Sequence, residues 1–226
     1  MDRLHRIREL LGAAAITRLQ NATVMVVGCG AVGSFAIEAL ARSGIGHLIL
    51  VDFDRVEESN INRQIFATTS TIGRAKVDVA AARIRDINPD VMVETFDVFF
   101  DDKTEIDVNP DVVIDAIDSV PSKIALYGWC AARNIPFVAS MGAARKTDIS
   151  RIKIDRISRT SVCPLAARVR KLVKENNIAD FPAVFSTEPA RAMTADGPLG
   201  SIITVTGTFG LMLAGWVIDY ITTPNN

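Results

Sequence analysis

The sequence predicts an α/β fold in which a doubly wound, mostly parallel sheet carries helices on both faces. Short apolar runs alternate with amphipathic stretches along the chain. The apolar runs are nearly continuous, which is typical of parallel strands that are buried on both sides. At 226 residues the chain is long enough for one domain with a continuous core.

Strands and helices are predicted to alternate from the first apolar run onward. Residues 1–20 precede that run and have the spacing of one or two amphipathic helices. The segment 150–158 alternates apolar and charged residues, which predicts a strand with one wet face. The other predicted strands are 24–28, 47–52, 91–96, 112–118 and 136–142, and the predicted helices are 34–44, 72–87, 123–134 and 167–174.

The helix after the second strand has the clearest local signals. Thr71 is a candidate N-cap, and Asn88 with the proline behind it stops the helix. Between them an apolar face repeats at helical spacing. Its members are Val77, Ala80, Ala81, Ile84 and Ile87.

We expect residues 1–226 to form a single domain in three parts. Residues 1–20 are an N-terminal helical arm, 21–145 a nucleotide-binding core, and 146–226 an extension on the substrate side that ends in a helix. The segment 201–218 carries no charge, and it is just long enough to suggest a membrane-spanning helix. Threonines and glycines dilute it, and no Lys or Arg cluster flanks it. We therefore expect a buried helix without stable membrane insertion, and peripheral membrane contact is the alternative.

Composition indicates an ordinary globular protein of the cytoplasm. The net charge is −1, so any surface for nucleic acid must be local. We expect no secretory signal, because the first residues are charged throughout. The cysteines, Cys29, Cys130 and Cys163, are odd in number and form no CxxC pair. This argues against a disulfide framework and a structural zinc ribbon.

A glycine motif follows the first strand. Gly28, Gly30 and Gly33 form GxGxxG where the strand meets a helix, and Asp52 ends the next strand. Glycines let the backbone approach phosphate at the helix N-terminus, and the acid can accept hydrogen bonds from ribose hydroxyls. The motif predicts a Rossmann-like half that binds an adenine nucleotide. Taken alone it also fits an NAD-binding oxidoreductase, a nucleotide sensor, or a tight turn without a ligand.

The following residues favour ATP over NAD. Asn60, Arg63 and Lys76 lie just beyond the second strand, together with Gln64. Converging cations suit a departing pyrophosphate, whose charge grows as its bond breaks. Asp118 ends the predicted strand 112–118, and a carboxylate there can hold Mg²⁺. The alternatives are surface charges for Arg63 and Lys76, and a helix cap for Asp118.

These motifs, "GCGAVGS", "LVDFD", "SNINRQI", "GRAK" and "DAIDS", resemble the ATP-dependent adenylating core of the ubiquitin-activating-enzyme superfamily, over residues 20 to 145. The resemblance implies that Asp52 contacts ribose and that Asn60, Arg63 and Lys76 bind the triphosphate. It implies that Asp118 coordinates Mg²⁺. It also implies a homodimer in which Arg3 reaches the partner's ATP.

The second half resembles the tRNA threonylcarbamoyladenosine dehydratase branch, through "IRDINPD", "PLAARVRKLVK", "VFSTEP" and "VTGTFG". That branch adenylates a threonine carboxylate on a modified adenosine in tRNA, which then cyclises with net loss of water. The alternative is adenylation of a ubiquitin-like sulfur carrier, and a sulfur-transfer protein is a further candidate partner. The cations available for tRNA phosphates are Arg156, Arg159, Arg168, Arg170, Lys171 and Lys174. Cys163 precedes a helix start, where the helix dipole can lower a thiol pKa.

Overall fold

In the computed structural model, which describes residues 2–192 and 199–223, a seven-stranded sheet forms the centre of the protein. The strand order is β3-β2-β1-β4-β5-β7-β6, and β6 is antiparallel to its neighbour β7 while the other pairs are parallel. The strands are β1 Thr23–Val27, β2 His47–Val51, β3 Met92–Phe96, β4 Val112–Asp115, β5 Phe137–Ser140, β6 Ile152–Arg156 and β7 Pro182–Ser186. The predicted fold class is confirmed.

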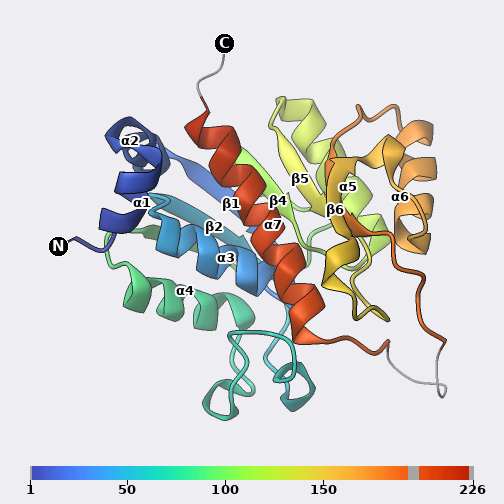
Figure 1. Ribbon diagram of the computed structural model, residues 1–226, viewed down its shortest axis with the longest axis horizontal. Coiled ribbons are helices and arrows are strands. Elements are labelled where there is room, and N and C mark those ends of the chain that lie inside the picture. Colours follow the sequence, from blue (N-terminus) through green and yellow to red (C-terminus); the bar gives the residue numbers. More distant parts are fainter. Residues whose placement is uncertain (1, 193–198, 224–226) are drawn as a thin grey trace.

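Helices cover both faces of this sheet (Figure 1). One layer contains α3, α4 and α7, and the other contains α5 and α6. Each layer encloses its own apolar cluster, so the inner strands are buried on both sides, whereas the edge strands β3 and β6 are largely exposed. The helices are α1 His5–Leu11, α2 Ala13–Asn21, α3 Gly33–Ser43, α4 Lys76–Ile87, α5 Val120–Arg133, α6 Pro164–Glu175 and α7 Ile203–Thr222.

The chain changes direction across the sheet between β1 and β4. From β1 it runs outward through β2 to β3, and it then returns to β4 and continues on the other side through β5. The helices that follow β1 and β4 therefore diverge onto opposite faces. A crevice at the carboxyl ends of these two strands is where open α/β sheets bind ligands.

Three local predictions need correction. Thr71 does not cap α4, because it lies in a short 3-10 turn and α4 begins at Lys76. The fourth strand ends at Asp115 rather than at Asp118, since Asp115 turns its side chain back to accept from the N–H of Ile117. In β6 only Ile152 is buried, because this strand forms the edge of the sheet.

Two glycines allow α7 to pack closely on α3. A Cβ added at Gly210 would lie 2.3 Å from the backbone oxygen of Val32, and one at Gly207 would lie 3.2 Å from the ring of Phe35. This inner face belongs to the larger apolar cluster, as a buried helix requires. Among the described residues α7 is the one helix long and apolar enough to cross a membrane, and 44% of its apolar window is buried.

We expect Gly210→Ala to destabilise the protein by about 1–3 kcal/mol, because the new methyl group meets backbone rather than a flexible side chain. Gly215→Ala is the matched control on the same helix. A Cβ at Gly215 has no atom within 4 Å, so this change should stabilise the helix by roughly 0.5–1 kcal/mol. Urea unfolding of both variants measures the difference, and equal shifts would contradict this account of the packing.

Candidate functional site

A cavity of about 760 Å³ opens at the carboxyl edge of the sheet, over the point where the strand order reverses. Its walls come from the ends of β1, β2, β4 and β5 and from the starts of α3, α6 and α7. It contains seven of the nine residues that the sequence marks as functional. These are Gly28, Gly30, Asp52, Asn60, Arg63, Lys76 and Asp118.

The three glycines of the loop after β1 are each needed for a different reason. Gly28 has φ +98°, and a Cβ there would lie 2.6 Å from the oxygen of Ala116. A Cβ at Gly33 would lie 1.7 Å from the oxygen of Gly28, so Gly33 permits tight packing of the turn. Gly33 lies outside the cavity wall, whereas Gly30 faces the open space. The sequence motif therefore overstated the ligand-facing role of its third glycine.

The same loop presents backbone donors to the cavity. Within the described residues, the N–H groups of Gly30, Ala31 and Val32 have no protein acceptor, and all three residues line the cavity. They precede the first turn of α3, at the positive end of its dipole. Such an arrangement can bind an anion such as phosphate.

Asp52 is held in place beside this loop. Its carboxylate accepts from the N–H of Cys29 at 2.6 Å and from the N–H of Asp54 at 2.8 Å. Burial raises the pKa of this carboxyl above its usual value, and the nearby Lys76 ammonium partly opposes the increase. These bonds fix the carboxylate at the end of β2, where it lines the cavity and can accept from a ribose.

The predicted cations reach the same cavity from the segment after β2. Lys76 is buried, and its ammonium donates to Asp54 Oδ2 at 2.6 Å. Arg63 is partly exposed and donates to the oxygen of Ser59 at 2.6 Å. Asn60 is buried in a short turn and accepts from the N–H of Glu57. Lys76 is therefore not a solvated surface charge, and Gln64 joins this wall as well.

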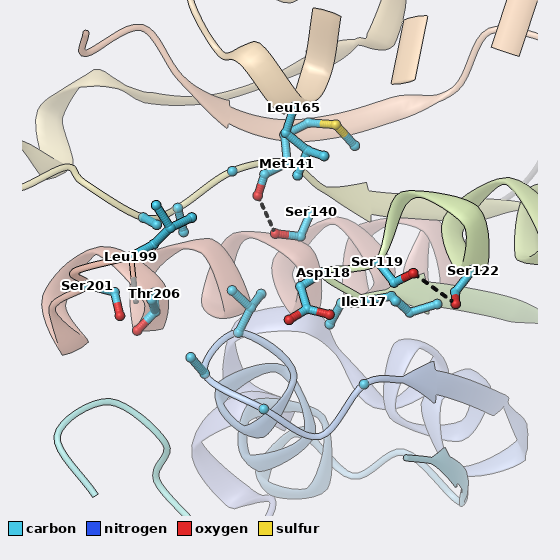
Figure 2. A pocket seen from close by; sticks show the side chains of 18 of the residues that line it. Ile117, Asp118, Ser119, Ser122, Ser140, Met141, Leu165, Leu199, Ser201 and Thr206 are labelled. Atoms are coloured by element: carbon cyan, nitrogen blue, oxygen red, sulfur yellow. Dashed lines mark hydrogen bonds between the residues drawn. The ribbon is translucent and has the colours of Figure 1, made fainter. Parts of the chain in front are cut away.

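Asp118 projects into the cavity from the turn after β4 (Figure 2). Its side chain has no hydrogen bond or ion pair within residues 2–192 and 199–223. It does not cap α5, whose N-cap residue is Ser119. No group of three or more His, Cys, Asp or Glu side chains that could hold a metal occurs in the described part of the chain. A carboxylate without a partner among the described residues, close to backbone N–H groups that can bind phosphate, suits Mg²⁺. This ion binds one or two carboxylates together with substrate phosphates.

A buried charge pair fixes the turn that carries Asp118. Lys123 on α5 donates to Asp115 Oδ2 at 2.8 Å and to the oxygen of Ser140 at 2.7 Å. The hydroxyl of Tyr127 donates to the same carboxylate oxygen at 2.5 Å. Burial, and then the Asp115 charge, raise the pKa of Tyr127 well above its usual value. The network joins the ends of β4 and β5, and sequence patterns do not reveal it.

Each end of the cavity is apolar. Beside Asp52, Phe53 and Phe99 contact each other edge to face at 4.9 Å between ring centroids. At the other end, Met141, Leu165 and Leu199 line the wall (Figure 2). The sequence analysis did not find these residues. The predicted strand 136–142 was a signal for Met141, because this residue lies near the carboxyl end of that strand, at the same edge of the sheet.

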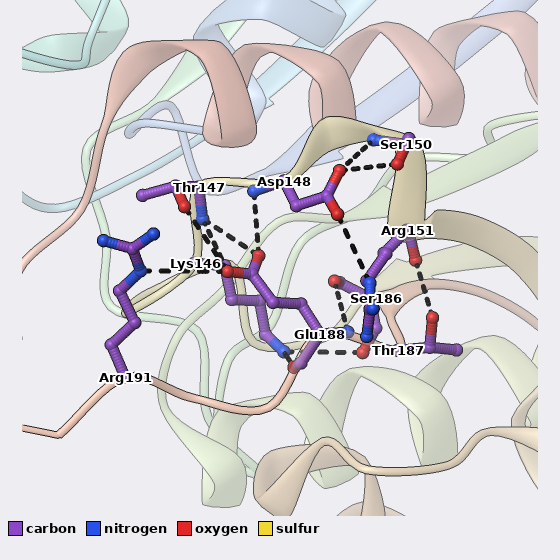
Figure 3. Close-up of polar contacts among 9 residues, drawn as sticks. All are labelled: Lys146, Thr147, Asp148, Ser150, Arg151, Ser186, Thr187, Glu188 and Arg191. Atoms are coloured by element: carbon purple, nitrogen blue, oxygen red, sulfur yellow. Dashed lines mark hydrogen bonds and ion pairs between the residues drawn. The ribbon is translucent and has the colours of Figure 1, made fainter.

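A polar network supports the wall beyond β5 (Figure 3). The Glu188 carboxylate accepts from the N–H groups of Thr147 and Asp148, both at 2.9 Å for the Oε2 atom. The Lys146 ammonium donates to the backbone oxygens of Ser186 and Glu188. The hydrogen bonds from Asp148 and Thr147 lower the pKa of Glu188, although burial opposes this. The network ties the loop after β5 to the end of β7.

Of the remaining predicted features, Cys163 lines the cavity, whereas Arg3 and the cations on α6 lie outside it. Arg3 donates to the oxygen of Ile87 at the end of α4 and so does not reach the cavity of its own chain. Cys163 is buried at the N-cap of α6, where its Sγ faces Gly142. On α6, Arg170 is held by Thr160, whereas Arg168 and Lys174 are exposed.

Comparisons with known proteins show the family and the fold of the chain. The ThiF family model matches residues 2–226. A tRNA threonylcarbamoyladenosine dehydratase of Bacillus subtilis is 45% identical over 182 residues, covering 79% of this chain and 72% of that protein. The solved E. coli tRNA N6-threonylcarbamoyladenosine dehydratase in complex with AMP has a TM-score of 0.92, with 37% identity over 97% of this chain and 93% of that one. The same E. coli enzyme in complex with ATP has a TM-score of 0.90 and 36% identity, with the same coverage.

We expect Lys123→Met to destabilise the fold by about 3–5 kcal/mol, because it leaves the Asp115 carboxylate buried without its cation. Adding Asp115→Asn to that variant should restore part of the loss, since no unpaired charge then remains. Lys103→Met is the control on an exposed lysine and should change stability by less than about 0.5 kcal/mol. Urea unfolding tests the series, and a double variant weaker than Lys123→Met alone would contradict the pairing.

Proposed function

Because the chain belongs to the ThiF family, we propose that it is an ATP-dependent adenylating enzyme whose substrate is the threonylcarbamoyl carboxylate of modified adenosine in tRNA. The observation that carries the proposal is the charged middle of the cavity. Backbone N–H groups without an acceptor among the described residues, the cations Arg63 and Lys76, and the Asp118 carboxylate line this region, between Asp52 and the end of β5.

ATP is the nucleotide that this cavity suits. The similar E. coli enzyme is solved in complex with ATP and with AMP. In this chain Asp52 would accept from the ribose, and the N–H groups of Gly30 to Val32 would donate to phosphate oxygens. Asn60, Arg63 and Lys76 would bind the triphosphate. Phosphate must then compete with Asp54 for the Lys76 ammonium.

The residues also fit a magnesium ion. Asp118 would hold Mg²⁺ together with phosphate oxygens, because its carboxylate is free among the described residues and lines the cavity. A bound Mg²⁺ neutralises the charge that grows on a departing pyrophosphate. Arg63 and Lys76 supply the same kind of stabilisation from the protein.

The reaction has two stages. A carboxylate oxygen forms a bond to the α-phosphorus as the bond to the bridging oxygen breaks, and pyrophosphate leaves with that electron pair. The carbamoyl oxygen of the same side chain then attacks the acyl carbon, AMP leaves, and a nitrogen loses its proton. An acceptor within the substrate has a high effective concentration, so no enzyme thiol is required. This suits a chain whose three cysteines are all buried.

A tRNA substrate needs phosphate-binding cations near the cavity. Pro164 and Leu165 at the start of α6 line the cavity, and the exposed Arg168 and Lys174 follow on the same helix. We propose this face as the docking surface for tRNA, in a cytoplasmic enzyme.

Activation of a ubiquitin-like sulfur carrier is the alternative function, and pyrophosphate exchange stimulated by such a carrier would favour it. A sulfur-transfer protein remains a candidate partner.

We expect Asp118→Ala to lower AMP and pyrophosphate formation at least about a hundredfold, because it removes the proposed metal ligand. Stability should be nearly unchanged, since the side chain has no bond in the described residues. Asp102→Ala, on an exposed turn, is the matched control. The assay uses tRNA that carries the modification, and formation of ADP by the unaltered protein would exclude this chemistry.

We propose further that the enzyme is a homodimer in which Arg3 acts in the cavity of the partner chain. Arg3→Ala and Asp118→Ala should each be inactive, but a mixture of the two should recover about a quarter of the activity. A mixed dimer then has one complete site, and random pairing makes half of the dimers mixed. Refolding the two variants together and measuring AMP tests this, and no recovery in mixed dimers would exclude a shared site.

A further inference from the structure

The cavity has an apolar region at each end and its charged groups in the middle. One end lies beside Asp52 and contains Phe53 and Phe99. The other end lies beyond Ser140, at the end of β5. Three inter-strand steps separate β2 from β5, which is roughly 14 Å at the usual spacing of strands. A nucleotide placed on Asp52 and the glycine loop therefore leaves the far end for a second group.

The far end is formed by residues that approach from three elements. Met141 follows β5 and is 3% exposed, whereas Leu165 is on the first turn of α6. A Cβ added at Gly142 would lie 3.6 Å from the Cβ of Leu165, so these two elements are in contact. Leu199 precedes α7 and is 59% exposed, although it lines the same cavity. Figure 2 shows Met141, Leu165 and Leu199 above the level of Asp118.

We propose that this apolar end, formed by Met141, Leu165 and Leu199, binds the purine base of the substrate nucleoside after the base has left its stack in the tRNA. The inference rests on the proposed function and adds the place where the substrate base binds. A base with its two flat apolar faces gains from such walls, and enzymes that act on a base often bind it in an extruded position. The exposed Leu199 would close over the base.

The arrangement also matches the distance between the base and the reacting group. The carboxylate is attached to the base through a short side chain, and Asp118 lies between the apolar end and the glycine loop. A base at Met141 and Leu165 therefore directs its carboxylate to the charged middle. A carrier tail that ends in Gly-Gly has no side chain for these apolar walls, so the walls favour a base over such a tail.

The test is direct binding of the modified nucleoside, threonylcarbamoyladenosine, measured by calorimetry. An ATP analogue with a methylene bridge between its α- and β-phosphates is present, so that no turnover occurs. We expect Leu199→Ala to weaken binding about fivefold to tenfold, through the apolar contact that it removes. Leu199→Phe should tighten binding, because a ring stacks on a base. Leu211→Ala alters an equally exposed leucine outside the cavity and should have no effect.

A second ligand separates the base from the carboxylate. N-Carbamoylthreonine has the same carboxylate but no base, so it should bind more weakly than the nucleoside and should not respond to Leu199→Ala. Affinity for the ATP analogue should be the same in every variant. If the unaltered protein binds no nucleoside, the proposed function fails and this inference fails with it. Two other results would overturn only this inference. In the first, the protein binds the nucleoside but Leu199→Ala leaves its affinity unchanged. In the second, the nucleoside binds no more tightly than N-carbamoylthreonine.

Discussion

The buried pair of Asp115 and Lys123 joins the two halves of the site. Both side chains are fully buried, so their charges are stable only because each has close partners. The Lys123 ammonium bonds the Asp115 carboxylate at the end of β4 and the Ser140 oxygen at the end of β5. Asp118 lies three residues after the first of these points, and the loop with Met141 follows the second. A shift in this pair would therefore move the proposed metal ligand and the proposed base site together.

The glycine loop depends on a second constraint, which is steric. Gly28 packs on the backbone of Ala116, and Gly33 packs on the backbone of Gly28. Ala116 belongs to the turn that Asp115 begins, so the loop after β1 and the turn after β4 hold each other in place. The three N–H groups at the start of α3, which have no acceptor in the part of the chain that the structure describes, thereby take a fixed position relative to Asp118. Such rigid donors need little rearrangement when negative charge develops near them.

The sequence predicted the fold class, the helices and six of the seven strands, because these depend on local patterns, but it did not predict β7. Seven of its nine candidate site residues line the cavity. Apolar runs specify strands, and a strand followed by GxGxxG specifies the loop. It misplaced the end of β4, since the side chain of Asp115 ends that strand by bonding its own backbone two residues on. The partners of Lys123 were not predictable, because Ser140 is brought near only by the pairing of β4 with β5.

The second apolar end was beyond sequence reasoning for a similar reason. Met141, Leu165 and Leu199 are far apart in the chain, and each is an ordinary apolar residue when taken singly. They become a wall because β5, α6 and the segment before α7 reach one edge of the sheet. The same topology that orders the strands thus decides where a substrate can enter.

An adenylating enzyme must keep its activated acyl group from water until an acceptor attacks. A cysteine thiol could serve as that acceptor, but Cys163 is buried against Gly142. Burial also raises the pKa of Cys130 to about 12 and that of Cys29 well above its usual range. The proposed reaction needs only that the substrate's own carbamoyl oxygen be held close, where effective concentrations reach about 10⁵–10⁸ M. The apolar wall proposed for the base lies next to the charged middle that would hold the acyl group. It would serve both needs, because it excludes water and leaves the substrate's side chain as the nearest nucleophile.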